Sequence, residues 1–414
     1  MPEVSNRGTQ MPASPIRKLV PFADAAKAEG VKVYHLNIGQ PDLPTPQKAL
    51  DSLKHITRKT LEYSHSQGLL SLRETLCKYY RRFGVALTPE DMLITTGGSE
   101  ALLFAFLACL DSGDEIIVTE PGYANYLGFA KMADVKVVSV TSHIENGFAL
   151  PSAEEFEAAI TPRTRAILIC NPNNPTGYLY NREELHRLRD IVMERNLFLI
   201  VDEVYREFVY GDEPFESALT MRGCEENVVV VDSVSKRYSE CGTRIGMLVT
   251  RNGEVRSTAL KFAQARLSPP LLGQIVAEES IEGTAAYSRE CFEEYKARRD
   301  FFIKGLNEIP GVYSPMPQGA FYTVVSLPVD DAEKFTKWCL TDYKYIDPEW
   351  LSLNPEYTGE TVMFAPAAGF YGNPELGRKQ VRMAYVLKVE NLARCLAILR
   401  GALKKYNNQA QPSH

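Results

Sequence analysis

The sequence predicts an α/β fold, in which a large domain holds a mostly parallel, doubly wound sheet and a smaller α+β domain is built from both chain ends. Short apolar runs alternate with helical segments through the middle of the chain, which is typical of strand–helix–strand units. Polar residues directly follow several of these runs, as they do where parallel strands end at a ligand. At 414 residues, the chain also exceeds what one hydrophobic core usually serves.

The composition is that of an ordinary globular enzyme. Apolar residues make up 45% of the chain and charged residues 24%. The formal net charge of −6 gives no electrostatic reason to bind nucleic acid or an anionic membrane. A few local arginines could still hold a small anion, so we expect small-molecule ligands.

The cysteines and the apolar runs indicate a cytoplasmic protein. The eight cysteines are scattered and include no C-x-x-C pair, so neither a disulfide framework nor a metal site is expected, and free thiols suit a reducing compartment. The longest apolar run, at 101–110, has about half the length that a bilayer span requires. The polar N-terminus lacks the charged-then-apolar layout of a secretion signal.

Four segments are predicted along the chain. Residues 1–14 are expected to form a flexible N-terminal arm, and 15–48 the N-terminal part of the small domain. Residues 49–286 are assigned to the large domain, and 287–414 to an interdomain helix followed by the C-terminal part of the small domain. Within the last segment, 338–357 is interpreted as a loop with two prolines, and its length suggests an insertion or a lid.

Two glycine turns in the first third of the chain could approach a ligand closely. A strand at 33–37 ends in a turn that contains Gly39, although turn punctuation alone would explain this glycine. A second strand ends in Gly97-Gly98, and a helix then begins near Ser99 and runs to residue 110. Glycines at the start of a helix leave N–H groups unpaired at the positive end of its dipole, which favours phosphate there.

The middle of the chain places reactive residues at successive strand ends. Strands are expected at 116–119, 136–140, 166–170, 197–201, 228–231, 321–326 and 381–386, and helices at 182–195 (after Asn181), 287–308 and 390–406. The fourth of these strands leads directly to Asp202 and Tyr205. The fifth leads to Lys236, and Arg244 follows within eight residues. Because both strands end at the edge where ligands bind, we hypothesise that Lys236 carries covalent chemistry.

Taken together, these residues resemble those of class I aminotransferases, the pyridoxal-phosphate (PLP) enzymes of the aspartate aminotransferase fold type. The resemblance spans roughly 15–406 and rests on Gly97-Gly98-Ser99, Tyr123, Asn174-Pro175-Thr176-Gly177, Asp202-x-x-Tyr205, Ser233-x-Ser235-Lys236, Arg244 and Arg382. Each motif alone occurs by chance, but their order on a strand–helix background is specific. The resemblance implies a PLP-dependent aminotransferase with a ping-pong mechanism.

The resemblance also implies roles for the residues around the cofactor. Lys236 would bind PLP covalently and move the substrate's α-proton, while Asp202 would keep the ring nitrogen protonated. Tyr205 and Asn174 would donate to the phenolate oxygen, although Asn174 could also serve only the turn before Pro175. Tyr123 matches the residue that stacks on the ring. The phosphate would be bound by Gly98, Ser99, Ser233, Arg244 and Tyr63 of a neighbouring subunit, which implies a homodimer with shared active sites.

Substrate recognition is implied at two further positions. Arg382, with Gly39 and Asn174, matches the group that binds the α-carboxylate, and a structural salt bridge is the competing role for this arginine. Arg266 is a candidate for binding a side-chain carboxylate, and a role as an ordinary helix-surface arginine has about the same weight. Arg17 is a second candidate. We expect aspartate or a similar amino donor, with 2-oxoglutarate as the acceptor.

Two other functions stay open at this point. A PLP-dependent lyase or synthase of the same fold would share the cofactor residues and eliminate at the β- or γ-carbon. A non-catalytic regulator built on an aminotransferase domain would carry an N-terminal DNA-binding module, for which we expect no room. The presence of Lys236, Asp202 and Arg382 also argues against such a regulator.

Overall fold

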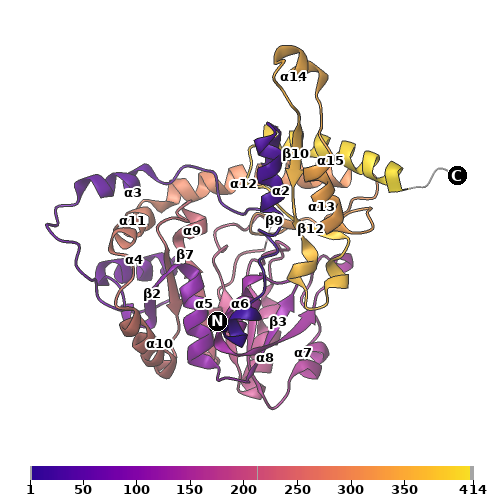
Figure 1. Cartoon of the computed structure of the whole chain (residues 1–414). Helices are drawn as coiled ribbons and strands as arrows, with labels where there is room; N and C mark the ends of the chain where they lie inside the picture. The colour runs from indigo at the N-terminus through magenta and orange to yellow at the C-terminus, as the bar shows by residue number, and fades with distance from the viewer. Residues whose placement is uncertain (1, 212, 411–414) are drawn as a thin grey trace.

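The large domain is organised around a seven-stranded sheet with the strand order β2-β8-β7-β6-β5-β3-β4 (Figure 1). The computed structural model describes residues 2–211 and 213–410. The strands are β2 Met92–Thr96, β3 Glu115–Glu120, β4 Lys136–Thr141, β5 Thr164–Cys170, β6 Phe198–Asp202, β7 Val228–Ser233 and β8 Ile245–Val249. β8 runs antiparallel to both of its neighbours, and the other strand pairs are parallel. The predicted α/β fold with a mostly parallel sheet is confirmed.

Helices cover both faces of this sheet, which is why its strands are continuous apolar runs. One buried cluster contains Ile200 of β6 together with residues of α5 (Gly97–Cys109), α6 (Asn125–Ala133) and α10 (Gly253–Arg266). The other contains Leu199 and Val201 with residues of α4 (Leu70–Arg81), α8 (Arg182–Arg195) and α11 (Leu271–Glu282). Successive residues of one strand therefore face opposite sides of the sheet.

The small domain joins the two ends of the chain. Its β1 (Lys32–His35) pairs in parallel with β10 (Glu360–Met363). A second, antiparallel sheet has the order β11-β12-β9, with β9 Tyr322–Ser326, β11 Ala365–Pro366 and β12 Gln380–Ala384. Its helices are α2 Val20–Ala28, α13 Ala332–Thr341 and α15 Val389–Ala410, and α12 Thr284–Asn307 packs against α15. The segment boundaries proposed from the sequence stay predictions.

The remaining helices are short. They are α1 Asn6–Thr9, α3 Gln47–Ser52, α7 Ala153–Ala159, α9 Val234–Arg237 and α14 Pro348–Leu353, with 3-10 turns at Leu53–His55, Pro89–Asp91, Ile144–Asn146, Ala218–Thr220, Ala367–Phe370 and Pro374–Gly377. α1 lies within the segment predicted to be a flexible arm, which therefore contains one helical turn. No helix in residues 2–211 and 213–410 has both the length and the apolar character to cross a membrane.

The prediction of a loop over 338–357 is wrong in two places. Trp338 lies within α13, and α14 forms inside the segment. The side chain of Asp347 caps α14 by accepting two backbone N–H groups, and Pro348 takes a first-turn position, where its missing N–H is not needed. A proline that suggested a loop in the sequence is thus part of a helix start.

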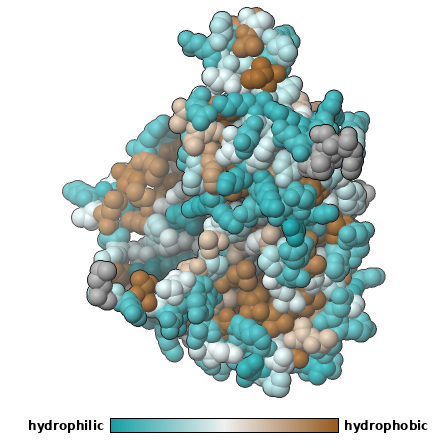
Figure 2. Space-filling model, turned by 45° about the vertical axis from the view of Figure 1, so that its right-hand side comes forward, coloured by the Kyte–Doolittle hydropathy of each residue, from teal (hydrophilic) through white to brown (hydrophobic). Residues whose placement is uncertain are grey.

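Residues 346–359, which we name the projection, stand away from the rest of the small domain (Figure 1). At the base of the projection, Tyr345 and Glu360 are joined by two backbone hydrogen bonds, of 2.8 and 2.9 Å. Figure 2 shows apolar side chains on its surface, and Leu353 is 78% exposed. The projection is therefore attached at a narrow neck and contributes little to the core.

Candidate active site

A pocket of about 710 Å³ lies where β5, β6 and β7 end, between the large sheet and the small domain. Strand ends contribute Cys170, Asp202 and Ser233, and the small domain contributes Tyr322 and Arg382. The pocket brings together most of the residues predicted from the sequence: Arg17, Gly39, Gly98, Ser99, Tyr123, Asn174, Asp202, Tyr205, Ser233, Lys236, Arg244 and Arg382. The expected site at the carboxyl edge of the sheet is thus present as one cavity.

Lys236 is presented to the pocket by α9, a single turn that continues directly from β7. The Ser233 hydroxyl starts this turn by accepting the Ser235 N–H at 3.1 Å. The Lys236 ammonium donates to the Gly39 carbonyl oxygen at 3.1 Å and lies 3.8 Å from Cys241 Sγ. A strand and a capped turn therefore position the lysine, and few contacts restrain its amine.

Asp202 ends β6 and is 5% exposed. Its carboxylate accepts the Tyr126 hydroxyl at 2.9 Å and the Val204 N–H at 3.3 Å. Burial raises the pKa of Asp202 to about 6, although the Tyr126 hydrogen bond opposes this rise. A buried carboxylate of this kind gains strongly from a cationic partner, such as a protonated ring nitrogen.

Two phenols and an amide meet beside Asp202. The Tyr205 hydroxyl lies 3.4 Å from Asn174 Nδ2 and 3.2 Å from the Tyr322 hydroxyl. Tyr322 also donates to the Gly39 carbonyl at 3.3 Å, which joins the two segments of the small domain at the pocket. These donors are placed to bind an anionic oxygen on a flat ligand, and the Tyr123 ring also lines the cavity.

An anion cradle forms where α5 begins. Gly97 has φ +74°, and a Cβ there would lie 2.3 Å from an Arg244 side-chain nitrogen, so the guanidinium sits against this backbone. A Cβ on Gly246 would lie 2.4 Å from the Gly98 nitrogen, which leaves no space for any side chain at position 246. The Ser233 hydroxyl is 2.8 Å from the Ile245 carbonyl oxygen. Helix N–H groups, an arginine and hydroxyls thus fit a phosphate.

Arg382 is almost fully buried and carries free hydrogen-bonding capacity. Its guanidinium donates to Asn174 Oδ1 at 3.2 Å and to the Asn37 carbonyl at 2.5 Å. Its Nε has no partner among the described residues, and its guanidinium carbon lies 4.6 Å from the centre of the Tyr322 ring. None of the ion pairs within residues 2–211 and 213–410 involves this arginine, so the structural salt bridge that competed with substrate binding is absent there.

Two predicted residues lie outside this pocket. Tyr63 is 76% exposed in the segment before α4. Arg266 donates to the carbonyl oxygens of Ser66 and Ile94 at 3.3 and 3.2 Å and lies 3.7 Å from a Glu100 oxygen. Arg266 thus does not line the pocket of its own chain, and a role for it in binding substrate stays a prediction. It is not a helix-surface arginine either, since its side chain is only 16% exposed.

Sequence reasoning missed several pocket residues. Tyr322, Asn37 and Cys241 line the cavity, and Tyr126 orients Asp202 from outside its lining. Tyr322 opens a strand that was predicted, but no motif marked its side chain as facing the site. Tyr126 follows Tyr123 at helical spacing, and this is the one local signal that could have linked the two.

Comparisons with known proteins agree with the fold and the pocket. The family described as "Aminotransferase class I and II" matches residues 31–352. A putative aminotransferase of Bacillus subtilis is 31% identical over 402 residues, which cover 96% of this chain and 97% of the relative. The aspartate aminotransferase of Thermotoga maritima is 33% identical over 345 residues, which cover 82% and 89%.

Solved structures of aminotransferases also match this chain. Aspartate aminotransferase from Thermus thermophilus with maleate superimposes with a TM-score of 0.86 at 29% identity, and covers 97% of this chain and 100% of that one. Alanine aminotransferase from Pyrococcus furiosus gives 0.85 at 31% identity, with the same coverage. The fold is that of the aminotransferases.

The chain belongs to the class I and II aminotransferase family, and the protein is a transaminase. The resemblance drawn from the ordered motifs is confirmed, and so is the expected class of enzyme. The lyase and the non-catalytic regulator, which the sequence left open, are therefore not favoured. The family implies an amino acid and a 2-oxo acid as substrates, and PLP as cofactor.

Proposed function

We propose that this transaminase uses PLP to move the amino group of a dicarboxylic L-amino acid, with aspartate favoured, to 2-oxoglutarate by a ping-pong mechanism. The observation that carries the proposal is the meeting of Lys236, Asp202 and Arg382 in one cavity beside an anion cradle. A lysine, a carboxylate and an arginine are the groups that a PLP–amino acid pair requires.

The residues present fit the cofactor. When bound, PLP supplies a carbonyl that takes up the amino group and a ring that withdraws electrons from the reacting carbon. Asp202 would hold a proton on the ring nitrogen, and Tyr205 and Asn174 would donate to the phenolate oxygen. The cradle of Gly98, Ser99, Ser233 and Arg244 would bind the phosphate, with Tyr123 against the ring.

Lys236 moves the proton in this proposal. Its amine donates to the Gly39 carbonyl, which fixes the direction of the side chain. With cofactor and substrate bound, a neutral Lys236 amine would take the α-proton as general base and give it back as general acid. Tyr322 and Arg382 close the small-domain side of the same space and limit the entry of water.

Arg382 binds the α-carboxylate. Its stacked guanidinium and unpartnered Nε are buried, so a carboxylate would find a donor that has already lost its water. Asn174 and the Asn37 carbonyl hold the plane of the guanidinium. In this orientation one arginine would bind both oxygens and so fix the α-proton relative to Lys236.

The charge of the pocket favours a dicarboxylic substrate. Four cationic side chains line it, namely Arg17, Lys236, Arg244 and Arg382, against the single carboxylate of Asp202 in this lining. Arg244 would bind the phosphate, and Arg382 would bind the α-carboxylate. Arg17 is left to bind a carboxylate on the substrate side chain. The Thermus structure with maleate, itself a dicarboxylate, supports this choice.

We also place the enzyme in the cytoplasm as a homodimer with shared active sites. Leu61 and Tyr63 are 64% and 76% exposed, and a second copy of the chain would cover them. Arg266 holds the carbonyl of Ser66 and so steadies the segment that carries Tyr63, whose hydroxyl would reach the phosphate of the neighbouring subunit. The cysteines are free thiols, in keeping with a reducing compartment.

Half-reaction spectroscopy of the holoenzyme against a panel of amino acids tests the function. Aspartate and glutamate should convert the visible absorbance band of the bound cofactor into its aminated form, and 2-oxoglutarate should restore the band. Sedimentation should give a dimer. Release of ammonia or pyruvate without conversion would contradict transamination and indicate elimination instead.

The substrate class is tested at Arg17. Arg17→Gln should lower kcat/KM for aspartate by about 10-fold or more, because one charge-assisted contact is lost, and should leave alanine unchanged. Lys18→Gln is the matched control, because Lys18 is the adjacent cation but pairs with Glu333 at 2.6 Å outside this pocket. Equal losses for aspartate and alanine would remove Arg17 from substrate recognition.

A further inference from the structure

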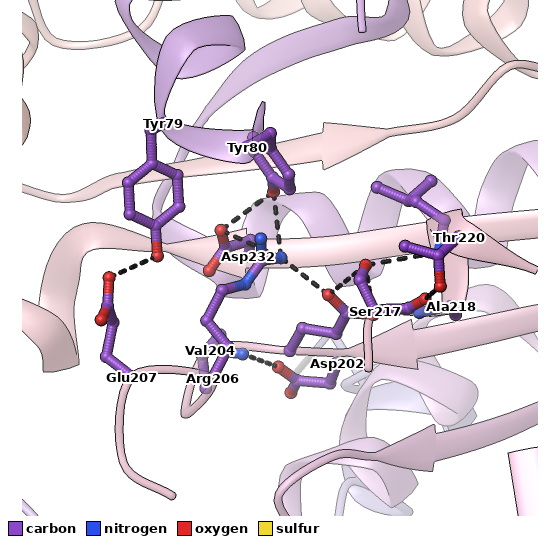
Figure 3. Close-up of polar contacts among 12 residues, drawn as sticks. Tyr79, Tyr80, Asp202, Val204, Arg206, Glu207, Ser217, Ala218, Thr220 and Asp232 are labelled. Carbon is purple, nitrogen blue, oxygen red and sulfur yellow. Dashed lines mark hydrogen bonds and ion pairs between the residues drawn. The ribbon is translucent and has the colours of Figure 1, made fainter. Parts of the chain in front are cut away.

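A buried group of charges lies directly behind the pocket, and the roles proposed above do not use it. We name it the rear cluster, and it consists of Glu203, Arg206, Asp232 and Arg237 with the phenols of Tyr79 and Tyr80. The side chains of its two carboxylates and two guanidiniums are 0% exposed. Figure 3 shows Arg206, Asp232 and Tyr80 converging on one side of the strands.

Each of three pocket residues has a rear-cluster residue as its direct neighbour in the chain. Glu203 follows Asp202, and Asp232 precedes Ser233. The pairs at the ends of β6 and β7 arise because successive residues of a strand face opposite sides. Arg237 follows Lys236 on α9 in the same way. The cluster is therefore attached to three of the segments that form the site.

Asp232 is the centre of the rear cluster. Its carboxylate accepts the Tyr80 hydroxyl at 2.9 Å and a hydrogen bond from Arg237, and lies 3.4 Å from an Arg206 nitrogen. It also accepts the backbone N–H of Ser233 at 2.7 Å. Burial alone would raise the pKa of Asp232, but the two guanidiniums outweigh burial and hold this pKa below its usual value.

Both guanidinium groups lie over tyrosine rings in addition to forming ion pairs. Arg237 lies over the Tyr79 ring at 4.6 Å, and Arg206 lies over the Tyr80 ring at 4.3 Å. Arg206 also donates to Glu203 at 2.8 Å. Both tyrosines belong to α4, so the cluster ties the ends of β6, β7 and α9 to a helix of the large domain.

Stability alone gives a weak reason for such a cluster. Buried ion pairs lose hydration, and apolar side chains of similar volume often serve a fold as well or better. α9, in contrast, is a four-residue turn that cannot hold its shape by its own hydrogen bonds. The bond between Arg237 and Asp232 closes this turn, with Ser233 and Lys236 inside the closed loop.

We propose that Arg237 is a positioning residue for proton transfer: anchored on Asp232 behind the sheet, it fixes the direction in which α9 presents Lys236 to the pocket. The inference rests on the proposed role of Lys236. Arg237 touches neither substrate nor cofactor and acts only through the turn. A side chain on one face of the sheet thereby controls a reaction on the other.

Arg237→Gln in the holoenzyme tests this role. The amine would keep its chemistry but lose its alignment, so kcat should fall between about 10- and 100-fold while KM changes much less. The α-deuterium isotope effect on kcat should rise, because proton transfer becomes slower than the other steps. The pH midpoint of the visible absorbance band should also shift, since the band reports the bond to Lys236.

Two further variants keep the result interpretable. Arg299→Gln is the control, because Arg299 is also buried, donates to the Pro317 carbonyl at 2.9 Å and lies over the Tyr210 ring at 5.0 Å, but does not line the pocket. It should lower the melting temperature without moving the isotope effect or the band. Arg237→Lys keeps the charge but not the fork, should recover part of kcat, and serves in place of the glutamine variant if that does not fold.

A wild-type isotope effect and band midpoint in a folded Arg237 variant would overturn the inference, and so would equal shifts in Arg299→Gln. This outcome is distinct from failure of the proposed function. A Lys236→Ala enzyme that still turned over would reject the role of Lys236 itself, whatever the Arg237 variants do.

Discussion

The two sides of the β6–β7 edge hold similar charged groups but differ in how these charges are balanced. In the rear cluster, two carboxylates meet two guanidiniums, and each charge has an opposite partner. In the pocket, four cationic side chains line the cavity together with one carboxylate, that of Asp202. Burial of charge is therefore not what marks the ligand side. The mark is the imbalance, which a bound anion would remove.

Lys236→Ala should give the largest effect on the pocket side. Turnover should fall on the order of 10³-fold or more, because the group that moves the α-proton is removed. The visible band of the bound cofactor should also be lost. The melting temperature of the cofactor-free protein should change little, since the Lys236 amine makes few contacts in the fold. A large fall in melting temperature would contradict this prediction, because Lys236 would then contribute to stability as the rear cluster does.

Asp232→Asn should give the largest effect on the rear side, and on stability. It leaves Arg237 as a buried charge without an opposite partner and takes from Arg206 one of its two carboxylate partners, which costs about 3–5 kcal/mol of unfolding free energy. Urea denaturation of the cofactor-free protein measures this loss. A change below about 1 kcal/mol would mean that water reaches the cluster, and the rear side would then not be a closed ionic network.

Arg382→Lys should lower kcat/KM by about 30-fold, or roughly 2 kcal/mol, for every amino acid substrate. Lysine keeps the positive charge but has no planar fork for two carboxylate oxygens. Steady-state kinetics with aspartate and alanine should show the same loss, in contrast to Arg17→Gln. Unequal losses would show that Arg382 reads the side chain rather than the α-carboxylate.

Glu240→Gln should give the smallest effect, and one that depends on pH. Glu240 lies in the loop between Lys236 and Arg244, and burial raises its pKa to about 8. The folded state thus keeps the proton that the unfolded chain has already lost, so wild-type stability falls as pH rises towards 8. The neutral glutamine lacks this fall, and between pH 7 and 8 the difference should be about 1 kcal/mol. Parallel urea midpoints at the two pH values would contradict it.

The sequence predicts the pocket well where a reactive residue directly follows a strand. Asp202 and the turn of Lys236 are of this kind, because a buried apolar run fixes both the element and the edge at which it ends. Tyr322 could not be found in this way. Its hydroxyl meets Tyr205 across a separation of 117 positions, and only the docking of the small domain brings the two together.

The features that the sequence did not reveal also have physical causes. Nothing local shows that Arg266, at the end of α10, turns towards carbonyls near β2 instead of the pocket. The rear cluster could not be predicted, because no sequence motif marks Arg237 apart from its position next to Lys236. In 338–357, Pro348 favours a loop in the sequence, whereas capping by Asp347 makes it the first residue of a helix. Pairings between distant segments and side-chain direction decide the first two cases, whereas a local cap decides the third.

The neck of the projection, made by Tyr345 and Glu360, has a consequence for how this chain can change length. Both strands of the neck are held by reciprocal backbone bonds, so residues can be added or removed beyond it without shifting the register of β10 against β1. The ties that would be lost are few, such as the ion pair of Asp347 with Arg394. Residues 346–359 are thus the part of the molecule in which insertions, fused domains or labels can be accepted while the transaminase keeps its core and its pocket.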